Sequence, residues 1–234
     1  MKSTILDKTK LVNSVFSKVY KKYDLMNDIM SLGIHRLWKS KFIDWMNPMQ
    51  NSKLIDVASG TGDIARLFSQ RVKNTAQITC IEPNDKMLKA GKENLKNLKN
   101  INWIKGNAEL LPVEDNTYDF YSISYGIRNV TDINKALKEA YRVLKPGGRF
   151  MCLEFSKIDN EILNFLYKHY SKAIPIIGKY VVGSSEPYEY LVNSIDAFYS
   201  QKKLLEIMLK NGFSNVEYRN LSNGVTAIHS GWKI

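Results

Sequence analysis

The stretch Asp56-Val-Ala-Ser-Gly60-Thr61-Gly62-Asp63-Ile-Ala65 follows an apolar, strand-like run and leads into a helical pattern. Its glycines permit a tight turn and a close approach of the backbone to a ligand. Gly60, Gly62 and Ala65 also fit the dinucleotide-binding pattern, and Glu82 lies at the expected distance downstream to bond a ribose diol. The stretch therefore predicts a cofactor loop between the first strand and the next helix of an α/β sheet.

The carboxylates at the two ends of this loop, Asp56 and Asp63, favour one class of cofactor. A dinucleotide places a pyrophosphate anion over the loop and the helix N-terminus. S-adenosylmethionine has no phosphate and places a cationic ammonium and sulfonium there, which carboxylates attract. We expect S-adenosylmethionine. An NAD-dependent reductase stays open, because Asp63 also suits the positive end of its own helix.

Outward from the loop, the chain alternates short apolar runs with helical patterns, which is typical of βα units around a mainly parallel sheet. The apolar runs are KLIDVA, QITCIE, INWIKG, YDFYSISYG and RFMCLEF. Two further β-like runs, NVEYRNL and GVTAIHSGWK, are separated only by the turn at 222–224 and predict a hairpin. We expect an α/β, Rossmann-like fold whose parallel sheet is closed by a C-terminal antiparallel hairpin.

The length and composition predict a single domain. A chain of 234 residues with 44% hydrophobic content can bury one substantial core and a small lid. We divide it into an N-terminal helical cap at 1–50, a cofactor-binding core at 51–156, a helical insertion at 157–200, and a final helix and hairpin at 201–234. Lysines and Pro175 interrupt the apolar, Tyr-rich insertion too often for it to cross a bilayer.

The formal net charge of +11 favours an anionic partner. No Arg-rich run, RNA-binding motif or finger-type metal ligand pair accompanies this charge, so we expect an anionic membrane surface rather than nucleic acid. Cys80 and Cys152 lie in apolar runs, which indicates buried thiols in a reducing compartment. The N-terminus lacks the apolar stretch of a signal peptide. We expect a cytoplasmic protein, with peripheral attachment to the inner face of the membrane left open.

A second cofactor contact is expected after the third strand, in Gly106-Asn107-Ala108-Glu109. The Asn107 side chain can donate and accept at an adenine edge, or it can form an ordinary Asx turn. Open α/β sheets bind ligands at the carboxyl ends of their parallel strands, and this position favours the adenine contact.

Nearly the whole chain resembles the quinone-biosynthesis C-methyltransferases that act on demethylmenaquinol and on 2-methoxy-6-polyprenyl-1,4-benzoquinol. Many methyltransferases share DVASGTGDIA, whereas YDLMNDIMSLGIHRLWK and YGIRNVTD are highly specific. The resemblance implies S-adenosylmethionine contacts at Thr61, Glu82, Asn107, Ala108 and Ser124. Two residues depart from the family pattern, Tyr20 where Ala is frequent and Glu82 where Asp is common, and Glu82 keeps the carboxylate.

On the acceptor side, a hydroquinone ring carbon becomes more nucleophilic when the phenol loses its proton. Arg128 is the first candidate for stabilising the phenolate, with Asn129 orienting it or a ring oxygen. The alternative is that Arg128 caps a helix or pairs with an acid. Tyr23 and Asp24 are expected to close over the site, although an aromatic at helical spacing also suits the core.

The three histidines, His35, His169 and His229, are weaker candidates for a base, because a lone histidine is more often structural. Their spacing suggests no metal site. Phe165, Tyr170, Ile176, Ile177 and Tyr180 of the insertion, with lysines beside them, suit either contact with lipid headgroups or packing on the core.

These observations predict S-adenosylmethionine-dependent C-methylation of a polyprenyl hydroquinone in ubiquinone or menaquinone biosynthesis. Two alternatives stay open, namely a methyltransferase for another small phenol or lipid, and a non-catalytic cofactor-binding subunit of a quinone-synthesis complex. The expected partners are the quinol and a membrane surface or such a complex, and a homodimer stays open. The choice between benzoquinol and naphthoquinol is not decided by the sequence.

Overall fold

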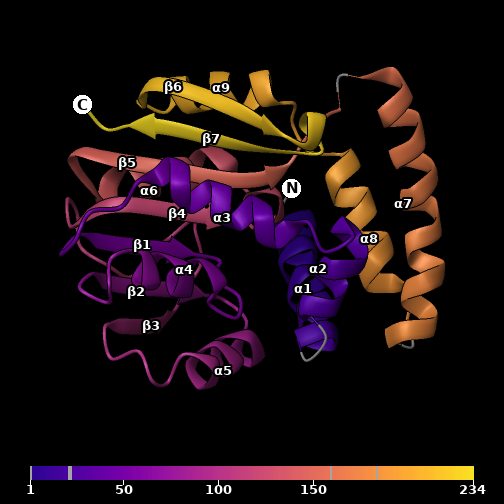
Figure 1. Cartoon of the computed structure of the whole chain (residues 1–234), viewed down its shortest axis with the longest axis horizontal. Helices are drawn as coiled ribbons and strands as arrows, with labels where there is room; N and C mark the ends of the chain where they lie inside the picture. The colour runs from indigo at the N-terminus through magenta and orange to yellow at the C-terminus, as the bar shows by residue number, and fades with distance from the viewer. Residues whose placement is uncertain (1, 21–22, 159, 183) are drawn as a thin grey trace.

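The computed structural model describes residues 2–20, 23–158, 160–182 and 184–234, around a seven-stranded sheet (Figure 1). The strands are β1 (Lys53–Val57), β2 (Gln77–Glu82), β3 (Ile101–Lys105), β4 (Tyr118–Ser124), β5 (Leu144–Phe155), β6 (Ser214–Leu221) and β7 (Thr226–Trp232). Their order is β3-β2-β1-β4-β5-β7-β6, and β7 pairs antiparallel with both β5 and β6. The predicted parallel sheet closed by a C-terminal hairpin is confirmed.

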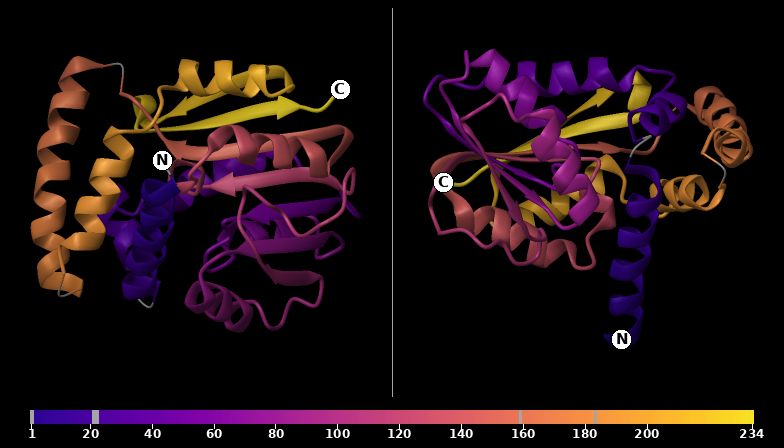
Figure 2. Two further views of the ribbon diagram at one scale, coloured as in Figure 1. Left: turned by 180° about the vertical axis from the view of Figure 1, so that it is seen from behind. Right: turned by 90° about the horizontal axis from the view of Figure 1, so that it is seen from below.

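Helices cover both faces of this sheet (Figure 2). They are α3 (His35–Met46), α4 (Asp63–Arg71) and α5 (Asp85–Asn94) on one face, and α6 (Ile133–Val143) and α9 (Gln201–Lys210) on the other. Phe42 of α3 and Phe68 of α4 are fully buried in one apolar cluster, while Leu137 of α6 and Met208 of α9 are fully buried in a second. Each face therefore has its own apolar layer, as expected for a doubly wound sheet.

Four further helices stand beyond the carboxyl ends of the parallel strands (Figure 1). They are α1 (Lys2–Val19), α2 (Tyr23–Ser31), α7 (Glu161–Val182) and α8 (Glu186–Asp196). Ile174 of α7 and Tyr188 of α8 are buried in the same cluster as Phe42, so these helices pack on the sheet. They cover the end of the sheet at which α/β proteins bind ligands.

Among the described residues, no helix is both long and apolar enough to cross a bilayer.

Candidate functional site

The glycine loop joins β1 to α4 in a conformation that needs small residues. The backbone φ is positive at Ala58 (54°), Gly60 (58°) and Gly62 (91°), a region that glycine adopts without strain. A Cβ on Gly62 would lie 2.6 Å from Leu95 Cδ1 and 3.1 Å from Trp103 Cζ2, so a larger residue would require these side chains to move. Gly60 N donates to Glu82 Oε2 at 2.8 Å. The loop is therefore held against the end of β2.

A pocket of about 230 Å³ opens beside this loop, and we call it the donor pocket. It is lined by Val12, Asn13, Phe16, Ala58, Gly60, Glu82, Pro83, Asn84, Met87, Asn107, Ala108, Glu109, Ser124, Tyr125, Gly126, Asn129, Val130 and Thr131. The structure thus brings together Gly60, Glu82, Asn107, Ala108 and Ser124, which the sequence proposed as cofactor contacts. Of the other candidates, Asp56 and Thr61 line an adjoining polar cavity, and Gly62 is the N-cap of α4.

Glu82 lies at the carboxyl end of β2 and is only 6% exposed. Its Oε2 accepts from Gly60 N, and its Oε1 accepts from Asn84 N at 2.9 Å. Burial raises the pKa of Glu82 to about 7, although both backbone donors favour the carboxylate. Each carboxylate oxygen can accept a second hydrogen bond. Glu82 is therefore suited to bind a pair of ribose hydroxyls.

Asp56 is 1% exposed at the end of β1. Ser122 Oγ donates to its Oδ1 at 2.6 Å, whereas Oδ2 has no hydrogen-bond partner among the described residues. Burial raises the pKa of Asp56 to about 7. A cationic group that donates a hydrogen bond to Oδ2 would give this oxygen a partner and favour the ionised carboxylate. The site therefore fits the ammonium group of S-adenosylmethionine.

Asp63, which the sequence offered as a carboxylate that attracts a cationic cofactor, is paired with cationic side chains in the structure. Its Oδ2 accepts from Lys39 Nζ at 2.6 Å, and Arg66 Nη2 lies 3.5 Å from Oδ1. These cations offset its charge, so the attraction for a cationic ligand rests mainly on Asp56. Sequence reasoning missed Lys39, whose only signal was its place in the specific block ending in HRLWK.

Asn107 forms the Asx turn that was the alternative interpretation of its sequence. Its Oδ1 accepts from the backbone N–H groups of Glu109 and Leu110, each at 3.0 Å. The expectation that this side chain both donates to and accepts from adenine is therefore corrected, because its acceptor is already engaged. The Nδ2 group can still donate a hydrogen bond to a ligand in the donor pocket.

The N-terminal helix α1 also contributes to the donor pocket, which the sequence did not reveal. Asn84 Nδ2 donates to Asn13 O at 3.1 Å and to Ser17 Oγ at 2.8 Å. Lys8 Nζ, at the other end of the contact, donates to Val130 O at 2.6 Å. The amphipathic pattern of α1 predicts a helix but not the surface that it covers, so only the resemblance to the family could have signalled this contact.

Arg128 lies in the short 3₁₀ segment η2 (Ile127–Asn129) that follows β4. Its side chain is 4% exposed, and Nη1 lies 2.6 Å from Glu154 Oε1 and donates to Tyr125 O at 2.7 Å. Arg128 thus pairs with an acid, as the alternative interpretation stated. Its Nη2 has no hydrogen-bond partner among the described residues. Arg128 also lines a cavity of about 570 Å³ between α1, η2 and α8, which we call the acceptor cavity.

Asn129 faces the donor pocket, and its Oδ1 accepts from Tyr190 Oη at 2.9 Å. Tyr190 lines the acceptor cavity. The two cavities share Val130 and Thr131 in their walls. The Arg128–Asn129 pair therefore stands where the two cavities meet. The side chains of Tyr23 and Asp24, also expected at this site, lie outside the described residues.

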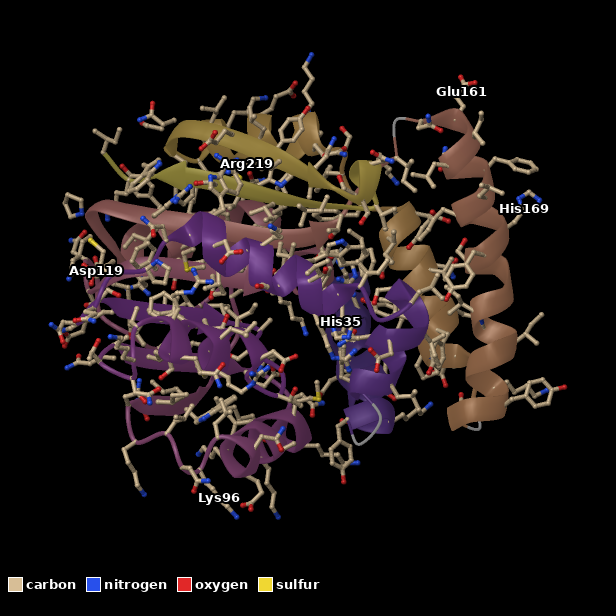
Figure 3. The ribbon with its side chains drawn as sticks, viewed as in Figure 1. His35, Lys96, Asp119, Glu161, His169 and Arg219 are labelled. Atoms are coloured by element: carbon tan, nitrogen blue, oxygen red, sulfur yellow. The ribbon has the colours of Figure 1, made fainter. Side chains whose placement is uncertain are left out.

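The histidines have structural contacts or face solvent. His35 Nε2 lies 3.0 Å from Asp28 Oδ1, and burial lowers the pKa of His35. His229 Nε2 lies 2.9 Å from Gln201 O, and burial lowers the pKa of His229 to about 4. His169 is exposed on the outer side of α7 and points away from the molecule (Figure 3). Within the described ranges, no group of His, Cys, Asp and Glu is arranged to hold a metal ion.

Comparison with known proteins matches the chain from end to end. The model of the ubiE/COQ5 methyltransferase family matches residues 3–233. The ubiquinone/menaquinone biosynthesis C-methyltransferase UbiE of Rickettsia bellii is 50% identical, with 97% of this chain and 94% of the relative covered. The protein of the same name from Brucella abortus is 47% identical, with 97% of this chain and 87% of the relative covered.

Solved structures share the fold at low sequence identity. A SAM-dependent methyltransferase of Thermotoga maritima superposes with a TM-score of 0.67 at 21% identity, covering 94% of this chain and 99% of that one. The phosphoethanolamine N-methyltransferase 2 of Haemonchus contortus, solved with S-adenosylhomocysteine, has a TM-score of 0.63 at 15% identity, covering 84% of this chain and 52% of that one. The predicted methyltransferase fold is confirmed.

Proposed function

The chain belongs to the ubiE/COQ5 methyltransferase family, and on that premise we propose that it transfers the methyl group of S-adenosylmethionine to a ring carbon of a polyprenyl hydroquinone in ubiquinone or menaquinone biosynthesis. The observation that carries the proposal is the junction of the donor pocket with the acceptor cavity at Arg128 and Asn129. S-adenosylmethionine supplies a methyl group on a sulfonium, which is already activated for transfer.

On the methyl-donor side, the protein binds and orients S-adenosylmethionine. Glu82 accepts from the ribose hydroxyls, Asn107 Nδ2 donates to the adenine edge, and Ala108 packs on the same wall of the pocket. Ser124 Oγ is buried without a partner in the described structure, so it is available to the donor. These contacts fix the methyl group at the junction of the two cavities, and such positioning accounts for much of the rate in this class of reaction.

On the acceptor side, Asn129 Nδ2 binds a ring oxygen, and the Arg128 guanidinium stabilises the phenolate. Among the described residues, Asn129 Nδ2 makes a long contact of 3.5 Å with Tyr125 O, so it can turn to a ligand. Glu154 holds the Arg128 guanidinium in place, and Nη2 remains for the acceptor or for a bound water. Tyr23 stays a candidate for the same site.

The experiment that tests this function measures methyl transfer from labelled S-adenosylmethionine to reduced short-chain analogues of both quinol precursors, with the oxidised quinones as controls. We expect label in at least one reduced acceptor and none in the oxidised controls, because only the hydroquinone has a nucleophilic ring carbon. Label in both reduced acceptors would indicate a dual-use enzyme. Tight donor binding without label in either would favour another phenol or lipid, or a non-catalytic subunit.

The insoluble tail of such a substrate also motivates a proposal for membrane attachment. The outer face of α7 carries large apolar side chains that are 58% to 87% exposed, namely Ile162, Phe165, Leu166, Ile176 and Tyr180. With the exposed Lys179 beside them, they suit an anionic lipid surface. Tyr170, also expected there, turns inward and donates to Ile29 O. The side chain of Ile177 lies outside the described residues.

Flotation with phospholipid vesicles tests this attachment. We expect the protein to float with anionic vesicles more than with zwitterionic ones, and the Phe165→Ser/Leu166→Ser variant to lose that binding. Leu209→Ser is the matched control, because Leu209 is 50% exposed on α9. Equal flotation of both variants would contradict the proposal. Cytoplasmic location, a homodimer and assembly with a quinone-synthesis complex stay predictions.

A further inference from the structure

Helix α8 contacts both residues of the Arg128–Asn129 pair. It packs between α1 and α7, beyond the carboxyl ends of the parallel strands (Figure 1). Tyr190 Oη donates to Asn129 Oδ1 at 2.9 Å, and Ser194 Oγ lies 3.4 Å from Arg128 Nε. Because Tyr190 and Ser194 are four residues apart, their side chains share one face of the helix. This face of α8 is therefore held in register with η2.

We propose that Tyr190 is a positioning residue for methyl transfer and that it fixes the orientation of the Asn129 amide toward the quinol. An asparagine amide has an oxygen that accepts hydrogen bonds and a nitrogen that donates them. A phenolate oxygen needs a donor, so the amide must present its nitrogen to the ring. The inference rests on the proposed function, because it takes Asn129 to bind a ring oxygen.

Two contacts favour the same orientation of this amide. The Tyr190 hydroxyl donates to Oδ1, and Nδ2 faces Tyr125 O at 3.5 Å. If the amide turned over, Oδ1 would face the carbonyl oxygen of Tyr125, and two acceptors repel each other. Tyr125 O also accepts from Arg128 Nη1 at 2.7 Å, which fixes its place. The Asn129 amide nitrogen is therefore held on the same side as the Arg128 guanidinium.

Tyr190 is suited to this role because its hydroxyl stays a donor. Burial raises the pKa of Tyr190, although the Arg128 cation partly offsets this effect, so the hydroxyl is protonated near neutral pH. Tyr190 lines the acceptor cavity and Asn129 lines the donor pocket. The hydrogen bond between them thus crosses the junction where the methyl group is transferred, and phenylalanine at position 190 would lack it.

A double-mutant cycle on methyl transfer separates positioning of Asn129 from direct contact with the quinol. We expect Tyr190→Phe to lower kcat/KM for the reduced acceptor about tenfold, the effect of one lost hydrogen bond at the reacting centre. In the Asn129→Ala background, the same substitution should change kcat/KM by less than about twofold, because no amide is left to orient. A tenfold loss that persists in this background would overturn the assignment.

Tyr218→Phe is the matched control for the lost hydroxyl. Tyr218 is 39% exposed on β6, where its ring packs on His229. This variant should keep the wild-type kcat/KM in both backgrounds.

Magnetic resonance of the side-chain amide gives a second readout that does not depend on turnover, and it decides the case in which Asn129→Ala is too slow to measure. The Asn129 amide signals are identified by their absence from the spectrum of Asn129→Ala. We expect Tyr190→Phe to shift or broaden these signals, because the amide loses the partner of Oδ1, and Tyr218→Phe to leave them in place. Unchanged signals in Tyr190→Phe would overturn the assignment of Tyr190.

Failure of the wild-type protein to methylate either reduced acceptor would instead contradict the proposed function. The amide signals would still test the contact between Tyr190 and Asn129, so the two failures are distinguishable.

Discussion

Arg128 and Glu154 form an ion pair whose side chains are only 4% and 1% exposed. Such a pair affects both folding and chemistry, because removal of one partner leaves the other charge buried and unpaired, at a cost of about 3–5 kcal/mol. Loss of activity in a single variant would therefore not identify a catalytic group. Replacement of both partners by neutral residues avoids the unpaired charge.

We expect Arg128→Ala to lower the free energy of unfolding by about 3–5 kcal/mol and to lower turnover as well. The double variant Arg128→Met/Glu154→Gln should recover most of the stability but not the turnover, because no guanidinium then faces the acceptor cavity. Urea unfolding and labelled methyl transfer measure the two effects. Wild-type turnover in the double variant would remove Arg128 from the chemistry.

The pKa values of about 7 for Asp56 and Glu82 predict pH-dependent donor binding. Ammonium and ribose hydroxyls bind the ionised carboxylates, so affinity should rise from about pH 6 to about pH 8, by up to about tenfold for each group. Asp56 also faces the charges of Glu82 and Asp63, which raise its pKa further. Calorimetry across this range measures the effect, and Asp56→Asn should flatten the profile. A flat wild-type profile would contradict these assignments.

The same carboxyl groups have the opposite effect on the ligand-free fold. Their folded pKa values lie above those of the unfolded chain, so between about pH 4 and about pH 7 the folded state binds more protons. Their contribution to stability is therefore fully present at low pH and lost as the pH rises through 7. Donor binding offsets this loss, because it favours the ionised groups.

The sequence predicted single site residues better than it predicted their partners. Gly60 and Glu82 were identified from the glycine-loop pattern and the spacing to the end of the second strand, and Ser124 from the resemblance to the family. Lys39 lies 24 positions from Asp63, and Arg128 lies 26 positions from Glu154. Ion pairs across such separations leave no local pattern in the sequence. These ion pairs set the local charge, and for that reason the pairing of Asp63 with Lys39 was not predicted.

At the scale of elements, Asn84 connects two helices. Its Oδ1 accepts from Lys86 N at 3.0 Å and Met87 N at 3.1 Å, which caps α5, while its Nδ2 donates to α1. Asn84→Asp keeps the cap but loses the donor to Asn13 O. This substitution therefore removes the hydrogen bonds to α1 and leaves the N-cap of α5 in place.

We expect Asn84→Asp to speed dissociation of S-adenosylmethionine at least about fivefold, because the Nδ2 hydrogen bonds that hold α1 over the donor pocket are lost. The cleavage of α1 by a protease should also become faster. Stopped-flow dissociation and limited proteolysis measure these changes, with Asn84→Ala as the variant that loses both contacts. Unchanged dissociation in Asn84→Asp would show that α1 does not control donor release.

Strands β1 to β5 were predictable as elements because each contains a short apolar run bounded by polar sequence, and β6 was predictable as the partner of β7 in a hairpin. The start of β5 was not, since the strand begins at Leu144, before the run RFMCLEF, and includes Pro146 and two glycines. Its pairing with β4 shifts register between Tyr118 and Phe120. A turn-like composition next to a register shift gives no periodic signal, so sequence patterns place such boundaries poorly.

At the scale of the whole molecule, the cap, the insertion and the sheet share one apolar cluster. Phe42 of α3, Leu153 of β5, Ile174 of α7 and Tyr188 of α8 are all fully buried in it. We therefore expect one cooperative unfolding transition, in agreement with the single domain that the length predicts. Calorimetry with coincident circular dichroism measures it. A separate low-temperature transition would show that the cap or the insertion folds independently.

The position of the transferred methyl group tests the central claim most directly. Isotopically labelled S-adenosylmethionine and the reduced acceptor would be incubated with the protein, and magnetic resonance of the product would distinguish a methyl group on carbon from one on oxygen. We predict that the label appears as a methyl group on a ring carbon. A label on a phenolic oxygen, or a product of equal yield from the oxidised quinone, would contradict C-methylation of a hydroquinone.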